Sequence, residues 1–121
     1  MNPARALNAL AAVRFAIGAG SWAAPRATGA LFGLDAAANP QVPYVARLFG
    51  ARDVALAVGA LTSEGQARRQ WLVAGLACDL ADAAAGYAGG RAKYLPALAS
   101  ALVTATALSA AALGAAALAS E

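Results

Sequence analysis

The last part of the chain, residues 95–119, most constrains the fold. It contains 25 residues and no charged side chain. As an α-helix it would be apolar on every side, and a chain of 121 residues cannot build a core wide enough to surround such a helix. At about 1.5 Å per residue it is long enough to cross a hydrocarbon core of about 30 Å. We therefore expect a transmembrane helix here, with a lipid bilayer as its partner.

Three further apolar stretches, residues 6–24, 44–62 and 71–88, are long enough to be transmembrane helices. Together they predict an all-α fold. The chain would be a single membrane domain, residues 1–121, in which four transmembrane helices form an antiparallel bundle. Because 40 of the 121 residues are the weakly hydrophobic Ala, a soluble Ala-rich bundle is the alternative. Arg14 interrupts the first stretch, which favours a transmembrane helix over a signal peptide.

Aromatic residues lie near the ends of these stretches. Each of Trp22, Tyr44, Trp71, Tyr87 and Tyr94 is within three residues of an end. Rings at such positions are typical of the membrane–water interface. The pattern predicts a multi-pass protein of the bacterial inner (cytoplasmic) membrane. Lys and Arg are balanced between the two sides, so they predict no orientation.

The first connection, residues 25–43, is bounded by Pro25 and Pro43. A connection this long is usually functional or partly helical. We expect a short interfacial helix at residues 28–38, lying over the end of the bundle, with a plain surface connector as the alternative. Phe32 lies within it and is a candidate contact to a bound molecule.

Six charged residues lie inside the apolar stretches. Each is costly at bilayer depth unless it is paired, so we expect all six to face the bundle interior as one neutral layer. The residues are Arg14, Arg47, Arg52, Asp53, Asp79 and Asp82.

Helix geometry predicts how these charges pair. Asp79 and Asp82 are three residues apart and share a helix face, whereas Arg52 and Asp53 point about 100° apart. We expect Arg14 or Arg52 to pair with the Asp79/Asp82 face, and Asp53 to find an Arg or a backbone donor elsewhere. Two carboxylates on one face need not both be ionised, so the layer is either a structural network or a ligand or proton site.

The roles that these residues would have in a ligand or proton site follow from their chemistry. Asp53, Asp79 and Asp82 are the candidate catalytic acids and bases, and Arg14, Arg47 and Arg52 are candidate substrate-binding residues, together with Phe32.

Several classes of function are excluded. The chain has no His and one Cys, so imidazole-ligated metals and internal disulfides are ruled out, and we expect no cofactor and no metal. The net charge is +3, but the basic residues form no continuous face, so we expect no nucleic-acid partner.

The segment Arg47-Leu48-Phe49-Gly50-Ala51-Arg52-Asp53, preceded by Phe32-Gly33-Leu34, resembles small four-helix bacterial membrane proteins of unknown function that are distantly DoxX-like. The resemblance implies a four-helix membrane bundle. It implies no activity and no catalytic residue.

Three functions fit this pattern. The first is a small membrane protein that binds a hydrophobic small molecule or acts as a membrane subunit. The second is a cofactor-free acid–base membrane enzyme that opens an epoxide, isomerises or cyclises a lipophilic substrate. The third is a proton-coupled exporter. Small residues four apart, Ala55/Gly59 and Gly86/Gly90, would also permit a homo-oligomer.

Overall fold

The computed structural model describes residues 1–119. Within them the chain forms five α-helices and no strand, which confirms the all-α class. The helices are α1 (Pro3–Ala23), α2 (Pro25–Leu31), α3 (Val42–Thr62), α4 (Gly65–Arg91) and α5 (Ala97–Leu118).

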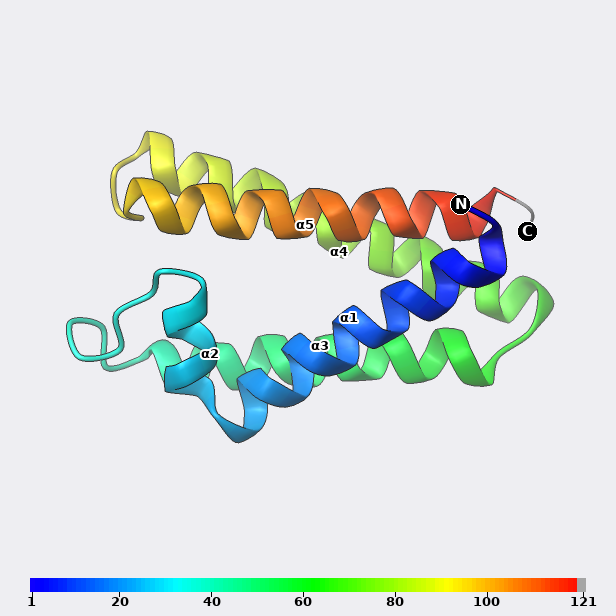
Figure 1. The fold of residues 1–121 in the computed structure, drawn as a ribbon, viewed down its shortest axis with the longest axis horizontal. Helices are drawn as coiled ribbons and strands as arrows, with labels where there is room; N and C mark the ends of the chain where they lie inside the picture. Colours follow the sequence, from blue (N-terminus) through cyan, green and yellow to red (C-terminus); the bar gives the residue numbers. More distant parts are fainter. Residues whose placement is uncertain (120–121) are drawn as a thin grey trace.

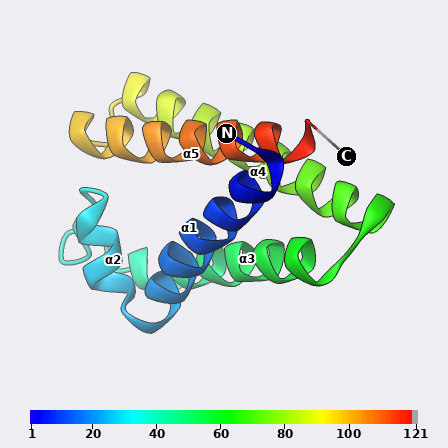
Figure 2. The ribbon, with the colours of Figure 1, turned by 45° about the vertical axis from the view of Figure 1, so that its right-hand side comes forward.

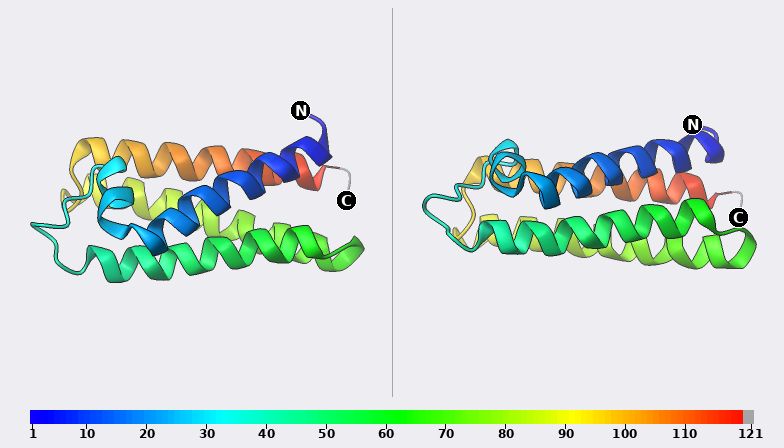
Figure 3. Two further views of the ribbon diagram at one scale, coloured as in Figure 1. Left: turned by 60° about the horizontal axis from the view of Figure 1, so that its bottom comes forward. Right: turned by 90° about the horizontal axis from the view of Figure 1, so that it is seen from below.

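The four long helices are arranged as two pairs. α1 packs against α3, and α4 packs against α5 (Figure 1). α1 crosses the bundle obliquely, so that its N-terminal end lies near α5 and its C-terminal end lies near α3 and α2 (Figure 2). The two pairs therefore lie closer together at the end that holds the chain termini. α2 and the loop after it lie at the opposite end (Figure 3).

Local sequence signals set the first helix boundaries. The side chain of Asn2 accepts a hydrogen bond from the backbone N–H of Arg5, and Pro3 occupies the first turn, where a missing N–H costs nothing. α1 ends at Ala23 because Pro25 begins a new helix at an angle to it.

The packing relies on small residues. A Cβ added at Gly50 would lie 2.4 Å from the carbonyl oxygen of Gly18, so α1 and α3 cross at a distance that only glycine permits. Leu10 and Leu72 are the largest side chains of the buried cluster at the end with the chain termini, and its other four buried members are all Ala. The helices are therefore held by close backbone approach more than by large side chains.

Two boundaries differ from the prediction. α4 begins at Gly65 and takes in most of the connection expected before residue 71. The short helix of the first connection lies at Pro25–Leu31 and not at residues 28–38. It ends early because Gly33 has a φ of 78°, in the left-handed region, and residues 32–41 form turns and irregular backbone.

The glycines of the small-residue pairs, Gly59, Gly86 and Gly90, pack against other parts of the same chain. Gly59 lies against the ring of Trp71, and Gly86 and Gly90 lie against α5, where the Ser100 hydroxyl donates a 2.8 Å hydrogen bond to the Gly86 carbonyl. Their small size is thus explained without self-association.

One helix within residues 1–119, α5, is both long enough and apolar enough to cross a membrane. Of its most apolar window, 28% is buried inside the bundle. This criterion considers length and composition alone, and by itself it does not support the predicted multi-pass arrangement.

Candidate functional site

The most buried ion pair joins the two helix pairs. Arg14 of α1 donates to both oxygens of Asp79 of α4, from Nη1 to Oδ1 at 3.0 Å and from Nη2 to Oδ2 at 2.8 Å. Both residues are 3% exposed. Gly75 makes room for the guanidinium, because a Cβ there would lie 2.7 Å from Nη2 of Arg14.

A second pair lies one helical turn further along α4. Arg52 of α3 donates from both Nη atoms to the carboxylate of Asp82, and the Nη1–Oδ1 distance is 3.0 Å. The two side chains are 33% and 32% exposed, so solvent reaches this pair more easily than the first. The Arg52 guanidinium also lies over the ring of Phe49, 4.9 Å from its centre.

Asp53 is shared between the two arginines. Its Oδ1 accepts a 3.2 Å hydrogen bond from Nη2 of Arg52 and lies 3.9 Å from Nη1 of Arg14. The sequence analysis expected Arg14 or Arg52 to pair with the Asp79/Asp82 face, and in the structure both arginines do so. Asp53 contacts these same two arginines and not a donor elsewhere. We call the five residues Arg14, Arg52, Asp53, Asp79 and Asp82 the Arg/Asp cluster.

Arg47 lies outside the Arg/Asp cluster, so the prediction of a neutral six-residue layer is wrong. Its Nε donates a 3.0 Å hydrogen bond to the carbonyl of Trp22, and its guanidinium carbon is 5.9 Å from the centre of the Trp22 ring. Arg47 precedes Arg52 by five positions on α3. It therefore lies on another face of the helix and nearer the end of the bundle. Two arginines therefore face three aspartates, and the ionised cluster carries a net charge of −1.

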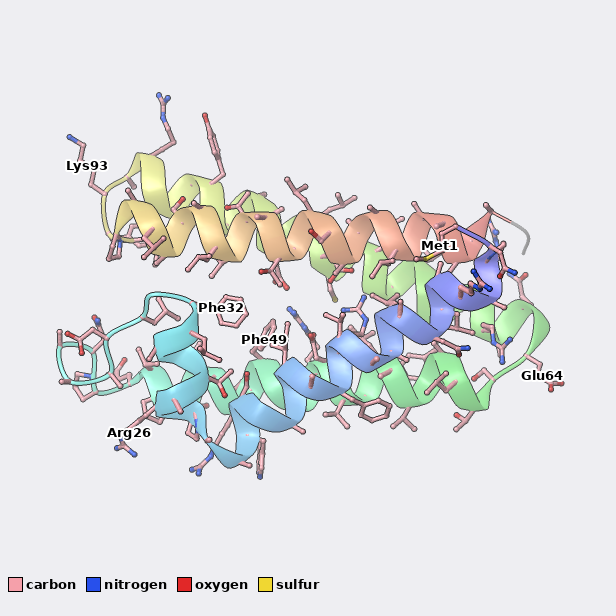
Figure 4. The ribbon with its side chains drawn as sticks, in the orientation of Figure 1. Met1, Arg26, Phe32, Phe49, Glu64 and Lys93 are labelled. Atoms are coloured by element: carbon pink, nitrogen blue, oxygen red, sulfur yellow. The ribbon has the colours of Figure 1, made fainter. Side chains whose placement is uncertain are left out.

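A cavity of about 810 Å³ reaches from the Arg/Asp cluster toward the α2 end of the bundle. Arg14, Asp53, Asp79 and Asp82 line it, and most of the other lining side chains are apolar. Figure 4 shows Phe32, which follows α2, and Phe49 of α3 directed into the space between the two helix pairs. The volume is in the range of small-molecule binding sites, about 300–1,000 Å³.

The first connection lies at the wide end of the cavity. Phe32 and Leu34 line the cavity and are partly buried, whereas Leu31 is exposed. A Cβ added at Gly33 would lie 3.2 Å from the backbone N of Ala99, so the loop packs against the start of α5. Phe32 therefore lines the same cavity as the Arg/Asp cluster, although the nearest member of the cluster in sequence, Arg14, is 18 positions away.

The sequence analysis missed hydroxyl groups in the cavity. Ser21 is 3% exposed and lines the cavity, as does Thr106 of α5. Neither hydroxyl has a hydrogen-bond partner within residues 1–119. Ser21 follows Arg14 by seven positions and so shares its helix face, a spacing that could have identified it.

The described residues contain no group of three or more His, Cys, Asp or Glu side chains arranged to hold a metal ion. Comparison of the chain with protein-family models, curated proteins and solved structures finds no match. The DoxX-like resemblance therefore stays a prediction. The structure defines an all-helical bundle with an internal ion-pair cluster beside a largely apolar cavity, and such a site is suited to binding a small molecule and holding a proton or an ionic group.

Proposed function

We propose that this protein is a polytopic membrane protein that binds a hydrophobic small molecule in the cavity between its helix pairs. Support for membrane insertion comes from where charge is exposed. On the first two helices, Arg5 and Arg26 are exposed, and the charge between them, Arg14, is buried. On α4, Arg69 and Arg91 are exposed, whereas Asp79 and Asp82 pair within the cluster. The exposed residues are 21 positions apart in the first pair and 22 in the second, about 32–33 Å at helical rise, which matches a hydrocarbon core.

On α3 the exposed charges also lie at the two ends of the apolar surface. Its exposed Arg47 and the exposed Glu64 beyond its end are 17 positions apart, about 26 Å. Arg47 reaches back to Trp22, so its charge can lie at the interface while its stem lies along apolar surface. Exposed aromatic rings from four chain segments gather at this end of the bundle, as an interfacial belt requires. They are Trp22, Tyr44, Tyr87 and Tyr94.

The observation that carries the binding proposal is the cavity that ends on the Arg/Asp cluster. An ion-pair network that only fixed the helix register would be sealed by side chains, because buried charges without solvent are stabilised by close, complete pairing. Here, an apolar space of about 810 Å³ lies beside the charges. That combination of an apolar body and a few convergent polar groups is typical of small-molecule sites.

Asp53 supports the second candidate, a cofactor-free acid–base enzyme acting on a lipophilic substrate. Asp79 and Asp82 each hold a guanidinium through two hydrogen bonds, whereas Asp53 shares the same two arginines through one oxygen. A third carboxylate on the cavity wall is the group best placed to exchange a proton with a bound molecule.

The binding proposal is tested with three molecules that share a phenylpentyl body and differ in their polar end: 5-phenylpentylamine, 5-phenylpentan-1-ol and 6-phenylhexanoate. The full chain is placed in phosphatidylcholine nanodiscs, binding is measured by titration calorimetry, and the signal of empty nanodiscs is subtracted. Saturable binding of any of the three supports the proposal.

Two neighbouring positions on α4 provide a matched pair of variants. Ala85 and Ala84 are both exposed, but Ala85 lines the cavity and Ala84 does not. Ala85→Phe is expected to weaken binding at least tenfold by filling the cavity, and Ala84→Phe is expected to leave it unchanged. Failure of all three molecules to bind, or equal effects of the two variants, would refute a binding cavity.

A further inference from the structure

The charged residues that line the cavity are strongly biased toward one sign. They are one arginine, Arg14, and four aspartates, Asp35, Asp53, Asp79 and Asp82. The chain as a whole has a formal charge of +3, so this acidity is not a property of its composition. Three of the aspartates lie together at the Arg/Asp cluster, and Asp35 is an exposed residue of the loop after α2 at the other end of the cavity.

Pairing within the Arg/Asp cluster does not cancel this charge. The Arg14–Asp79 and Arg52–Asp82 pairs are each neutral, which leaves the charge of Asp53 in excess. Arg47, which would have balanced it, lies at the bundle end against Trp22. Arg52 itself does not line the cavity, and its guanidinium is held against Phe49 and the two carboxylates. A molecule in the cavity therefore meets carboxylate oxygen more than guanidinium.

A second and independent feature indicates a ligand with a hydrogen-bonding group. Ser21 is 3% exposed, its side chain lines the cavity, and its hydroxyl has no partner within residues 1–119. The oxygen of this hydroxyl is accessible from the cavity, so a bound molecule can form a hydrogen bond with it in place of water. Ser21 lies about 10 Å along α1 from Arg14, toward the wide end of the cavity.

We propose that the cavity binds a lipophilic organic cation, an amine that is protonated at neutral pH on an apolar body. This inference rests on the proposed binding function and names its ligand class. The ammonium lies next to the carboxylates of Asp53 and Asp82, where it neutralises the excess negative charge. The apolar body extends along Phe32 and Phe49, whose ring faces also attract a cation. Ion pairing is strong here because the cavity wall is mostly apolar.

The same phenylpentyl series tests the charge preference, in the same zwitterionic nanodiscs. The amine is expected to bind at least about tenfold more tightly than the alcohol, because its ammonium forms an ion pair with a carboxylate, whereas the hydroxyl of the alcohol donates only a neutral hydrogen bond to it. The carboxylate is expected to bind more weakly than the alcohol. These comparisons use the wild-type chain and need no variant to fold.

Asp53→Asn then removes the excess charge. It leaves both bidentate ion pairs in place and keeps the shape of the side chain. Amine affinity is expected to fall at least about tenfold, and alcohol affinity is expected to change much less, because Asn can still accept a hydrogen bond from the hydroxyl. The matched control is Glu64→Gln, which removes a carboxylate at the opposite end of the bundle and is expected to change neither affinity.

The outcomes separate this inference from the function on which it rests. If the alcohol or the carboxylate binds as tightly as the amine, or if Asp53→Asn weakens the amine and the alcohol equally, the cation preference is refuted while the cavity remains a binding site. Tight alcohol binding with no gain for the amine would show that the cluster is already neutral, with a proton on one carboxyl group. If none of the three molecules binds, both proposals fail.

Discussion

Replacement of Asp79 by Asn should be among the most damaging single changes to the stability of this protein. Asp79 accepts two hydrogen bonds from Arg14, and both residues are 3% exposed. Asn keeps the size of the side chain but loses its charge. Arg14 would then depend on Asp53, whose nearest oxygen is 3.9 Å away and is already bonded to Arg52.

The expected loss follows from the difference in burial between the two ion pairs. Leaving one partner of a buried pair uncompensated costs about 3–5 kcal/mol. Asp82→Asn breaks a pair of the same chemistry on the same helix, but its side chains are 32–33% exposed, so the orphaned Arg52 stays partly solvated. It also keeps its hydrogen bond to Asp53. We expect about 1 kcal/mol for that change.

The assay is reversible unfolding of the full chain in detergent micelles titrated with sodium dodecyl sulfate, followed by circular dichroism. A double variant, Arg14→Met with Asp79→Leu, replaces the buried pair by apolar side chains and should recover most of the stability, because neither partner of the pair is left without the other. Equal losses for Asp79→Asn and Asp82→Asn, or no recovery in the double variant, would show that burial of the Arg14–Asp79 pair does not determine its contribution.

Four further outcomes are expected. The chain should remain with membranes through an alkaline carbonate wash, and its release into the supernatant would contradict membrane insertion. Gly50→Ala should destabilise the bundle by about 2 kcal/mol or more, because the new Cβ would lie 2.4 Å from a carbonyl oxygen. In the same unfolding assay, Gly114→Ala should be neutral or stabilise by up to about 1 kcal/mol, because the nearest neighbours of its Cβ are 3.9 Å away. Phe32→Ala should weaken 5-phenylpentylamine binding with little change in melting temperature, and the reverse result would make Phe32 a packing residue. Arg91→Ala, at an exposed helix end, should change stability by less than about 1 kcal/mol.

The core of the Arg/Asp cluster was predictable because helix geometry is regular. The spacing of Asp79 and Asp82 places them on one face of a helix, and equal distances from the starts of their segments bring Arg14 and Arg52 to the same depth. The contacts of Arg14 with Asp79 and of Arg52 with Asp82 follow this reasoning. Helix existence and class were predictable for the same reason, since long apolar runs have few other folds available.

The features that depend on tertiary packing could not be predicted. The position of the Arg47 side chain depends on how α1 crosses α3, because the crossing brings the Trp22 carbonyl 3.0 Å from the Nε of Arg47. The end of α2 depends on the turn that Gly33 makes against α5. The cavity exists because the two helix pairs contact each other less than the helices within each pair do, and the sequence pattern of one helix carries no information about the distance to another.

By hydropathy, α3 and α4 are too polar to cross a membrane, but the outer surface of the folded bundle is apolar at these helices. The Arg/Asp cluster explains this difference. A hydropathy window counts every residue of a helix equally, so the charges of α3 and α4 make these helices look too polar to cross a membrane, and α5 alone passes. Yet the charges in the middle of these helices, Arg52, Asp53, Asp79 and Asp82, pair with one another and with Arg14 inside the bundle. The surface between the helix ends exposes Val58, Val73 and Leu80. What a bilayer meets is the outer surface and not the average of the helix. The residues that lower the hydropathy of α3 and α4 are thus the same residues that give the cavity its polar wall, so a functional interior and an apolar exterior are consistent with one short sequence.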